Sequence, residues 1–250
     1  MIPLKDAITN FSRLELDPLT GIFKNTFKKP INNLFDVSDC LQESARWAVE
    51  NNFQKGGRSR KSIIENALIG KLGEFGVYKL LKWKGYNPSY PDLSVRKKGH
   101  DGGIDLTIIN DPNVENNPGV NVKASTQFSN TLLLKKEDWD STGNYKYREN
   151  PEHLACSFFF FVRISPDPKT FLKIDDSVTS EIIIDQLEQR MFHADFPGYL
   201  NINDFREIIS QDICLKEGEY LNSEKFRIPD DKYYCQTCDL RDIDTIKRIK

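Results

Sequence analysis

The sequence predicts an α/β fold in which a mixed central β-sheet is flanked by helices, and three kinds of segment support this prediction. Residues 156–164 (Cys-Ser-Phe-Phe-Phe-Phe-Val-Arg-Ile) are almost continuously hydrophobic, which is typical of a central buried strand. Residues 60–83 repeat apolar side chains at helical spacing. Residues 102–109 and 119–125 instead alternate apolar and polar side chains, as strands covered on one face do.

The remaining elements follow from shorter patterns. Residues 1–35 are rich in turn-forming residues and prolines, so we expect an arm or a peripheral subdomain there. Apolar residues at helical spacing predict a helix over 37–53. Further along the chain we expect a strand over 131–134, a helix over 180–191, a short helix from Asn203, and short strands and turns over 211–250. The predicted organisation is an N-terminal helical arm (1–55), a core (56–200) and a C-terminal β-rich extension (201–250), packed as one compact unit.

Composition limits the classes of protein that this chain can represent. It has 250 residues, of which 29% are charged and 38% hydrophobic, enough for one substantial core. It contains no run of about 18 apolar residues and no apolar region of a signal peptide, so we expect no membrane span. Five scattered cysteines favour a reducing, cytoplasmic environment over a disulfide framework. The net charge of −2 means that any nucleic-acid contact must come from local basic clusters.

The two alternating segments carry the residues with the clearest chemical potential. In residues 102–109, Ile104, Leu106 and Ile108 share one face, which places Asp105 on the other. In residues 119–125, the valines share one face and Asn121 and Lys123 the other. If both apolar faces lie on one core, then Asp105, Asn121 and Lys123 converge on the opposite face. A carboxylate, an amide oxygen and a lysine together suit a divalent metal ion and a phosphodiester.

The order of these residues resembles the PD-(D/E)XK nuclease superfamily, to which many Type II restriction endonucleases belong. Glu74 stands in the helix segment Gly-Lys-Leu-Gly-Glu-Phe-Gly-Val-Tyr-Lys-Leu-Leu (70–81), and Asp105, a turn and x-Val-Lys follow, so the resemblance covers residues 60–165. The family usually has Asp or Glu two residues before the lysine, where this chain has Asn121.

This resemblance implies a restriction-endonuclease-like sheet and a Mg²⁺-dependent DNA endonuclease, with Mn²⁺ able to substitute. Asp105, the backbone carbonyl of Val122 and Glu74 would hold the metal. Lys123 would orient the attacking water. The implied substrate is double-stranded DNA, and the implied assembly is a homodimer acting on a palindrome.

Several alternatives stay open at this stage. Glu74 either belongs to the site or forms a surface ion pair with Lys71 at i, i+3. Asn121 is either native with Glu74 compensating, or an inactivating replacement, or a sign of a degenerate site. The alternatives to a Type II enzyme are a catalytically silent nucleic-acid-binding module on the same fold, and a repair or phage nuclease without strict sequence specificity.

Two basic clusters are candidate contacts for the phosphate backbone. Arg58, Arg60 and Lys61 stand at the start of the long helix, where free N–H groups favour anions. Lys97, Lys98 and His100 precede the Asp105 segment. Such contacts position DNA without reading its sequence. Charge runs of this kind are also common on solvated loops.

Overall fold

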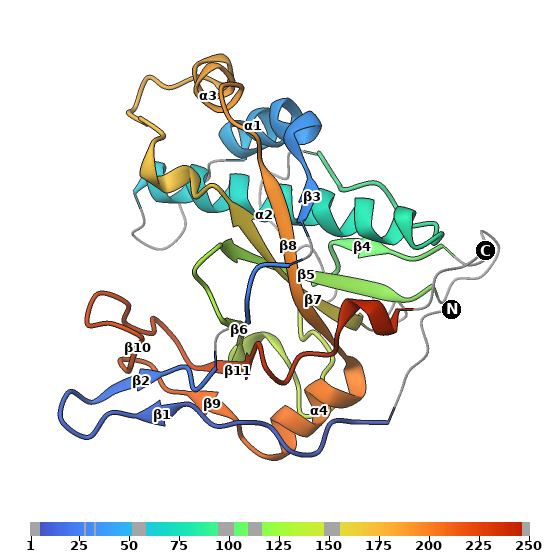
Figure 1. The fold of residues 1–250 in the computed structure, drawn as a ribbon, viewed down its shortest axis with the longest axis vertical. Helices are drawn as coiled ribbons and strands as arrows, with labels where there is room; N and C mark the ends of the chain where they lie inside the picture. The colour runs from blue at the N-terminus through green and yellow to red at the C-terminus, as the bar shows by residue number, and fades with distance from the viewer. Residues whose placement is uncertain are drawn as a thin grey trace.

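The computed structural model of the chain describes residues 6–27, 29–32, 34–51, 59–94, 103–109, 117–147 and 156–246. A curled five-stranded sheet lies at its centre, in the order β3-β8-β7-β5-β4 (Figure 1). Its strands are β3 (Leu34–Asp36), β4 (Leu106–Thr107), β5 (Gly119–Thr126), β7 (Cys156–Ser165) and β8 (His193–Asn201). The pair β5–β7 is parallel and the other three pairs are antiparallel, so the sheet is mixed, as predicted.

The predicted buried strand is β7, the middle strand of this sheet. Both of its faces are covered, which explains its nearly continuous hydrophobic sequence. Phe158 and Phe160 point into one hydrophobic core, and Phe159 and Phe161 point into a second core on the other face. These two cores divide the molecule into layers.

The first core lies between the sheet and three helices, α1 (Leu41–Glu50), α2 (Arg60–Trp83) and α3 (Ser180–Leu187), on one side of the sheet in Figure 1. Helix α2 spans the predicted range 60–83, and the side chain of Ser59 caps it by accepting from the N–H of Ser62. Two glycines let α2 approach the sheet closely. A Cβ on Gly73 would lie 2.5 Å from the Cβ of Ala124, and one on Gly76 would lie 2.6 Å from the Cβ of Ala194.

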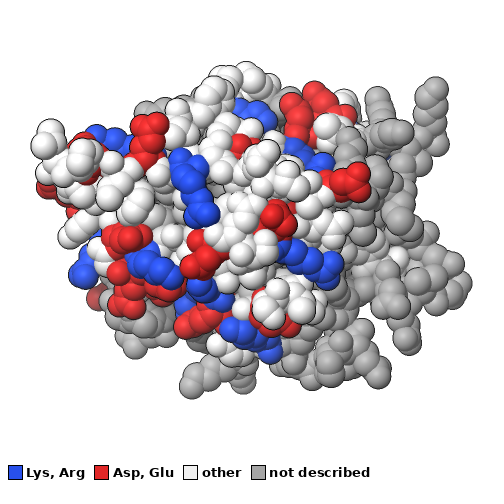
Figure 2. All heavy atoms as spheres, turned by 90° about the horizontal axis from the view of Figure 1, so that it is seen from below, with Lys and Arg blue, Asp and Glu red and all other residues white. Residues whose placement is uncertain are grey.

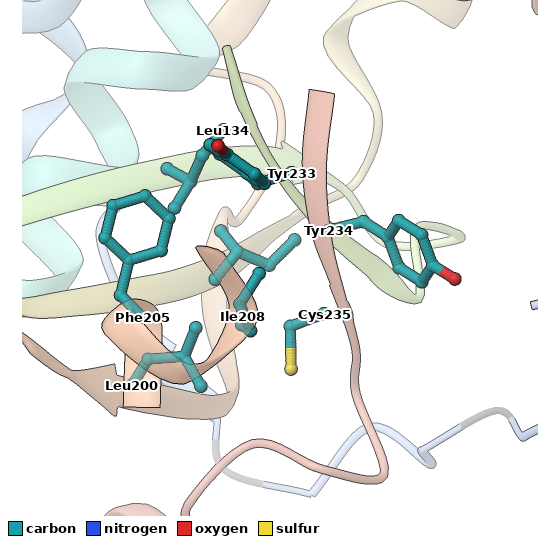
Figure 3. A pocket seen from close by; sticks show the side chains of 8 residues that line it. Leu134, Leu200, Phe205, Ile208, Tyr233, Tyr234 and Cys235 are labelled. Carbon is teal, nitrogen blue, oxygen red and sulfur yellow. The ribbon is translucent and has the colours of Figure 1, made fainter. Parts of the chain in front are cut away.

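The second core is covered by α4 (Ile202–Ser210) and by a three-stranded sheet in the order β6-β11-β9. These strands are β6 (Thr131–Lys135), β9 (Cys214–Leu215) and β11 (Lys232–Gln236). Figure 3 shows a small pocket between α4 and β11, lined by Phe205 and Ile208 of α4 and by Tyr233 and Cys235 of β11. It is part of this core and leaves no space for a water molecule.

The N-terminal segment differs from the expected helical arm. Residues 15–24 form a hairpin of β1 (Glu15–Leu16) and β2 (Ile22–Lys24), and β2 pairs in parallel with β10 (Tyr220–Leu221). The turn suits its residues, because Gly21 has a φ of +67° and donates to the carbonyl of Asp17. Of the predicted arm, only α1 and the short 3₁₀-helix η1 (Ser38–Cys40) are helical among the described residues.

Both ends of the described chain are fastened to each other. The N–H of Ile8 donates to Asp204 Oδ1 at 2.8 Å, and Arg241 donates to both the carboxylate of Asp204 and the carbonyl of Asp6. Buried Arg163 of β7 binds Asp195 of β8 and also the carbonyls of residues 29 and 30. The N-terminal residues therefore belong to the second core's outer layer. Three further 3₁₀-helices complete the described elements, η2 (Lys136–Asp138), η3 (Pro168–Thr170) and η4 (Ile243–Thr245).

Candidate active-site hairpin

Strands β4 and β5 form the hairpin that carries the predicted site residues. Their apolar side chains lie in the first core, namely Leu106, Ile108, Val120 and Val122. By strand alternation, Asn121 and Lys123 point to the opposite face, toward the second core. Strand β4 is shorter than the predicted segment 102–109 and begins at Leu106, so Asp105 lies just before it.

Asp105 is fixed at the edge of β5 by two hydrogen bonds. Its N–H donates to the carbonyl of Val120 at 2.9 Å, and its Oδ2 accepts from the N–H of Val122 at 2.6 Å. A bond from a backbone N–H to a carboxylate is charge-assisted and holds the side chain in one position. In an extended strand the C=O of a residue points to the same side as its N–H. The carbonyl of Val122 therefore faces the same edge as the Asp105 carboxylate.

Asn121 is 2% exposed, and described residues form a hydrogen bond with only one of the two polar atoms of its side-chain amide. Its Nδ2 donates to the carbonyl of Gly103 at 2.9 Å, while its Oδ1 has no hydrogen-bond partner there. Gly103 has a φ of +71° and lies against the ring of Tyr145, which a Cβ would approach to 2.8 Å. An unsatisfied buried acceptor costs about 1–3 kcal/mol. A bound cation or hydrogen-bond donor would recover that cost.

Lys123 is half-buried, and within the described ranges no carboxylate lies at ion-pairing distance from it. Its charge acts on other titratable groups, Asp138 and Cys156, without an ion pair. Burial raises the pKa of Asp138, and the positive charges of Lys135 and Lys123 act against that rise. Burial also raises the pKa of the Cys156 thiol to about 12, a rise that Asp105 adds to and Lys123 opposes. The charge of Lys123 thus acts on both Asp138 and Cys156.

Sequence reasoning did not single out Asp138. It ends the charged run Lys135-Lys136-Glu137-Asp138, which has the appearance of an ordinary solvated segment. Lys135, Lys136 and Asp138 of that run are all half-buried, and nothing in the sequence distinguishes them from the exposed Glu137.

Glu74 comes from α2 and so lies on the other side of the sheet. Lys71 Nζ is 2.6 Å from Glu74 Oε2, donates to the carbonyl of Asp92 at 2.8 Å and lies 4.0 Å from the centre of the Trp47 ring. The i, i+3 pair therefore forms, but it is buried rather than on the surface, since the Lys71 side chain is only 3% exposed. The segment containing Asp92 runs antiparallel to β4, because the N–H of Ser89 donates to the carbonyl of Thr107. Glu74 thus lies on the first-core side of the sheet, where α2 packs.

The oxygen donors at the hairpin fit a Mg²⁺ ion that keeps several of its waters. They are the Asp105 carboxylate, the Val122 carbonyl and the unsatisfied Asn121 Oδ1. Mg²⁺ prefers such oxygen ligands and often takes only one or two carboxylates. No group of three His, Cys, Asp or Glu side chains is arranged to hold a metal in the described part of the chain. A metal here would therefore depend on few charged ligands.

The predicted basic contacts are partly used inside the protein. Arg60 donates to the backbone carbonyls of Asp175, Asp176 and Val178, and Lys61 lies 3.7 Å from Glu65. The other predicted contacts lie outside the described residues, namely Arg58, Lys97, Lys98 and His100. On the face shown in Figure 2, acidic and basic side chains of described residues are interspersed, without an extended basic surface.

No family model, curated protein or solved structure matches this chain. No helix within the described ranges is long and apolar enough to cross a membrane.

Proposed function

We propose that this chain is a Mg²⁺-dependent DNA endonuclease of the PD-(D/E)XK type, with sequence-specific Type II restriction of double-stranded DNA as the first candidate activity. One observation carries the proposal. Within three residues, β5 presents a backbone carbonyl beside the Asp105 carboxylate, a buried amide oxygen and a half-buried lysine. Among the described residues, the amide oxygen has no hydrogen-bond partner and the lysine has no counter-ion. Unsatisfied polar groups of this kind are costly in a core and gather where a ligand completes them.

The chain's residues divide the chemical work of phosphodiester hydrolysis. When bound, Mg²⁺ neutralises charge on the phosphate and lowers the pKa of its water. Asp105, the Val122 carbonyl and Asn121 Oδ1 would hold the ion. Lys123 donates a hydrogen bond to the attacking water and offsets the charge that develops on the phosphate. The half-buried position of Lys123 strengthens that electrostatic effect.

The second candidate is a catalytically silent nucleic-acid-binding module. It is favoured by the neutral Asn121 and by the Lys71 ammonium, which already compensates the charge of Glu74. A repair or phage nuclease without strict sequence specificity is the third candidate. A measurement of Mg²⁺ binding does not distinguish the silent module or the nonspecific nuclease from a Type II enzyme, so DNA cleavage itself must be measured.

Incubation of the protein with plasmid DNA and Mg²⁺ or Mn²⁺ tests the proposal. Discrete bands whose ends share one sequence indicate a Type II enzyme, and a smear indicates a nuclease without strict specificity. The variant Asn121→Asp is assayed beside the natural chain. Activity that appears only in Asn121→Asp would mean that Asn121 replaces an acidic ligand. Binding without cleavage by both proteins would establish the silent module. Sedimentation of the protein together with a DNA duplex that contains the palindrome it cleaves tests the proposed homodimer.

A further inference from the structure

Residues 103–105 bring Asp105 to the edge of β5, and this short segment is held against the strand at both of its ends. At one end, two hydrogen bonds join Asp105 to the backbone of β5, at 2.9 Å and 2.6 Å. At the other end, the carbonyl of Gly103 accepts from Asn121 Nδ2 at 2.9 Å. The position of the proposed metal carboxylate therefore depends on where Gly103 lies.

The ring of Tyr145 makes the second contact to Gly103. A Cβ on Gly103 would lie 2.8 Å from both Cγ and Cδ2 of that ring, so the Gly103 backbone lies directly against it. Gly103 also has a φ of +71°, a conformation that a side chain would strain. The backbone of Gly103 is thus held both by the Asn121 amide and by the Tyr145 ring.

Tyr145 is itself fixed to the middle of the sheet. It is 9% exposed, its ring lies 5.3 Å from that of Trp139, and Trp139 lies 5.2 Å from Phe159 of β7. The backbones of Trp139 and Tyr145 also pair as an antiparallel bridge. The turn between them is closed by the N–H of Asp140, which donates to the carbonyl of Asn144 at 2.9 Å. The ring is therefore a fixed support for Gly103.

We infer that Tyr145 is a positioning residue of the proposed metal site. Its ring fixes Gly103, and Gly103 fixes the Asp105 carboxylate at the edge of β5. This inference rests on the proposed function, because the carboxylate that Tyr145 positions is the proposed metal ligand. Residues that orient a ligand without touching the metal typically contribute about 10–100-fold to metal affinity.

Mn²⁺ binding measured by isothermal titration calorimetry tests this role without any assay of cleavage. We expect Tyr145→Ala to weaken Mn²⁺ binding on the order of tenfold or more. Two variants should stay within about twofold of the natural chain. Tyr145→Phe keeps the ring, and Tyr147→Ala removes a neighbouring ring that is 41% exposed. Circular dichroism and thermal melting verify that the variants keep the fold.

Gly103→Ala tests the same contact from its other side. Its Cβ would meet the Tyr145 ring, so the segment must move, and we expect Mn²⁺ binding to weaken on the order of tenfold or more. Gly70→Ala is the control, because a Cβ there meets no atom within 4 Å. Gly103→Ala decides the question if Tyr145→Ala does not fold.

Hydrogen exchange of the metal-free protein separates positioning from a general loss of stability. In Tyr145→Ala, the N–H groups of Asp105 and Val122, which hold the segment to β5, should exchange faster on the order of tenfold. The N–H groups of β7 should keep their protection. A general loss of stability would instead speed exchange in β7 as well.

The outcomes separate this inference from the proposed function. Unchanged Mn²⁺ affinity in folded Tyr145→Ala overturns the inference, while cleavage by the natural chain would still support the nuclease. Weakened affinity without faster exchange at Asp105 also overturns it, because the ring would then act by another route. Absence of Mn²⁺ binding by the natural chain overturns both proposals. Weakened affinity with faster exchange confined to the hairpin supports the inference, and if the metal-loaded natural chain then cuts no DNA, only the nuclease proposal fails.

Discussion

Asp105 combines a structural and a proposed chemical role, and two substitutions distinguish them. Asp105→Asn keeps an oxygen that can accept from the Val122 N–H, but it removes the negative charge. Asp105→Ala removes both. We expect both variants to lose cleavage by at least about a hundredfold, since metal catalysis supplies several kcal/mol.

Their stabilities should differ, because only the alanine variant loses the hydrogen bond. We expect Asp105→Ala to lower the free energy of unfolding by about 1–3 kcal/mol, and Asp105→Asn by clearly less. Urea denaturation and plasmid cleavage measure the two effects. Cleavage within tenfold of the natural chain in either variant would exclude Asp105 as principal ligand.

Glu74 should behave as a structural residue, because the buried Lys71 already compensates its charge. Glu74→Gln removes the counter-charge of a lysine that is 3% exposed, although the Gln oxygen can still accept from Lys71 Nζ. We expect the free energy of unfolding to fall by about 1–3 kcal/mol. Mn²⁺ affinity should stay within about twofold of the natural value. A loss of affinity as large as that of Asp105→Asn would instead make Glu74 the second metal carboxylate.

The side-chain alternation of β5 was predictable from sequence, whereas the surroundings of its residues were not. Asn121 and Lys123 oppose Val120 and Val122 because strand side chains alternate, which needs no tertiary information. The surroundings of the Asn121 amide depend on Gly103 and Tyr145, which lie far from Asn121 in sequence. No short-range pattern encodes such contacts.

At the scale of elements, the close approach of α2 to the sheet offers a matched pair of glycine substitutions. Gly73 lies against Ala124, where a Cβ would approach to 2.5 Å, whereas a Cβ on Gly70 meets no atom within 4 Å. We expect Gly73→Ala to destabilise the protein by about 1–3 kcal/mol, because the helix must move away from β5. Gly70→Ala should stabilise it by up to about 1 kcal/mol through helix propensity.

Urea unfolding of the two variants measures this difference. Equal effects of the two substitutions would show that α2 does not contact β5 as closely as the structure places it. Because β5 carries the candidate site, Gly73→Ala should also reduce cleavage more than Gly70→Ala does.

Elements with strong internal signals were predicted best. Helix α2 has a serine cap and an apolar stripe along its whole length, and β7 has an unbroken hydrophobic run. The hairpin β1–β2 was missed, because strands of two and three residues carry little pattern and are defined by their pairing with β10. Strand β4 is shorter than its alternating sequence suggested for a related reason, since only Leu106 and Thr107 pair with β5.

For the molecule as a whole, Arg163 joins the central sheet to the N-terminal segment. Arg163 is 1% exposed. Its guanidinium donates to Asp195, to Asn130 and to the backbone carbonyls of residues 29 and 30. Arg163→Met would leave Asp195 buried without its cation. We expect a loss of about 3–5 kcal/mol in the free energy of unfolding. The surface pair Lys216–Asp231 is the control, and Lys216→Met should cost about 0–1 kcal/mol.

Chemical denaturation followed by fluorescence measures both variants. A cost below that of Lys216→Met would show that the buried pair does not hold the segment. Limited proteolysis gives an independent reading, since release of residues 29–32 from Asp195 should expose the nearby backbone to cleavage in Arg163→Met.

The fastening of residues 6–32 to residues 195–241 has a consequence for how the protein is made. Ribosomes add about 5–20 residues per second, so a nascent chain waits about 10–40 s between the emergence of Ile8 and that of Asp204. For part of that interval the β4–β5 hairpin has been synthesised, but α4 and β11, which follow it in the chain, have not. The second-core face of the hairpin is then uncovered, and Trp139 lacks its final packing against Phe205. Translation order therefore delays assembly of the candidate site until most of the polypeptide has been made.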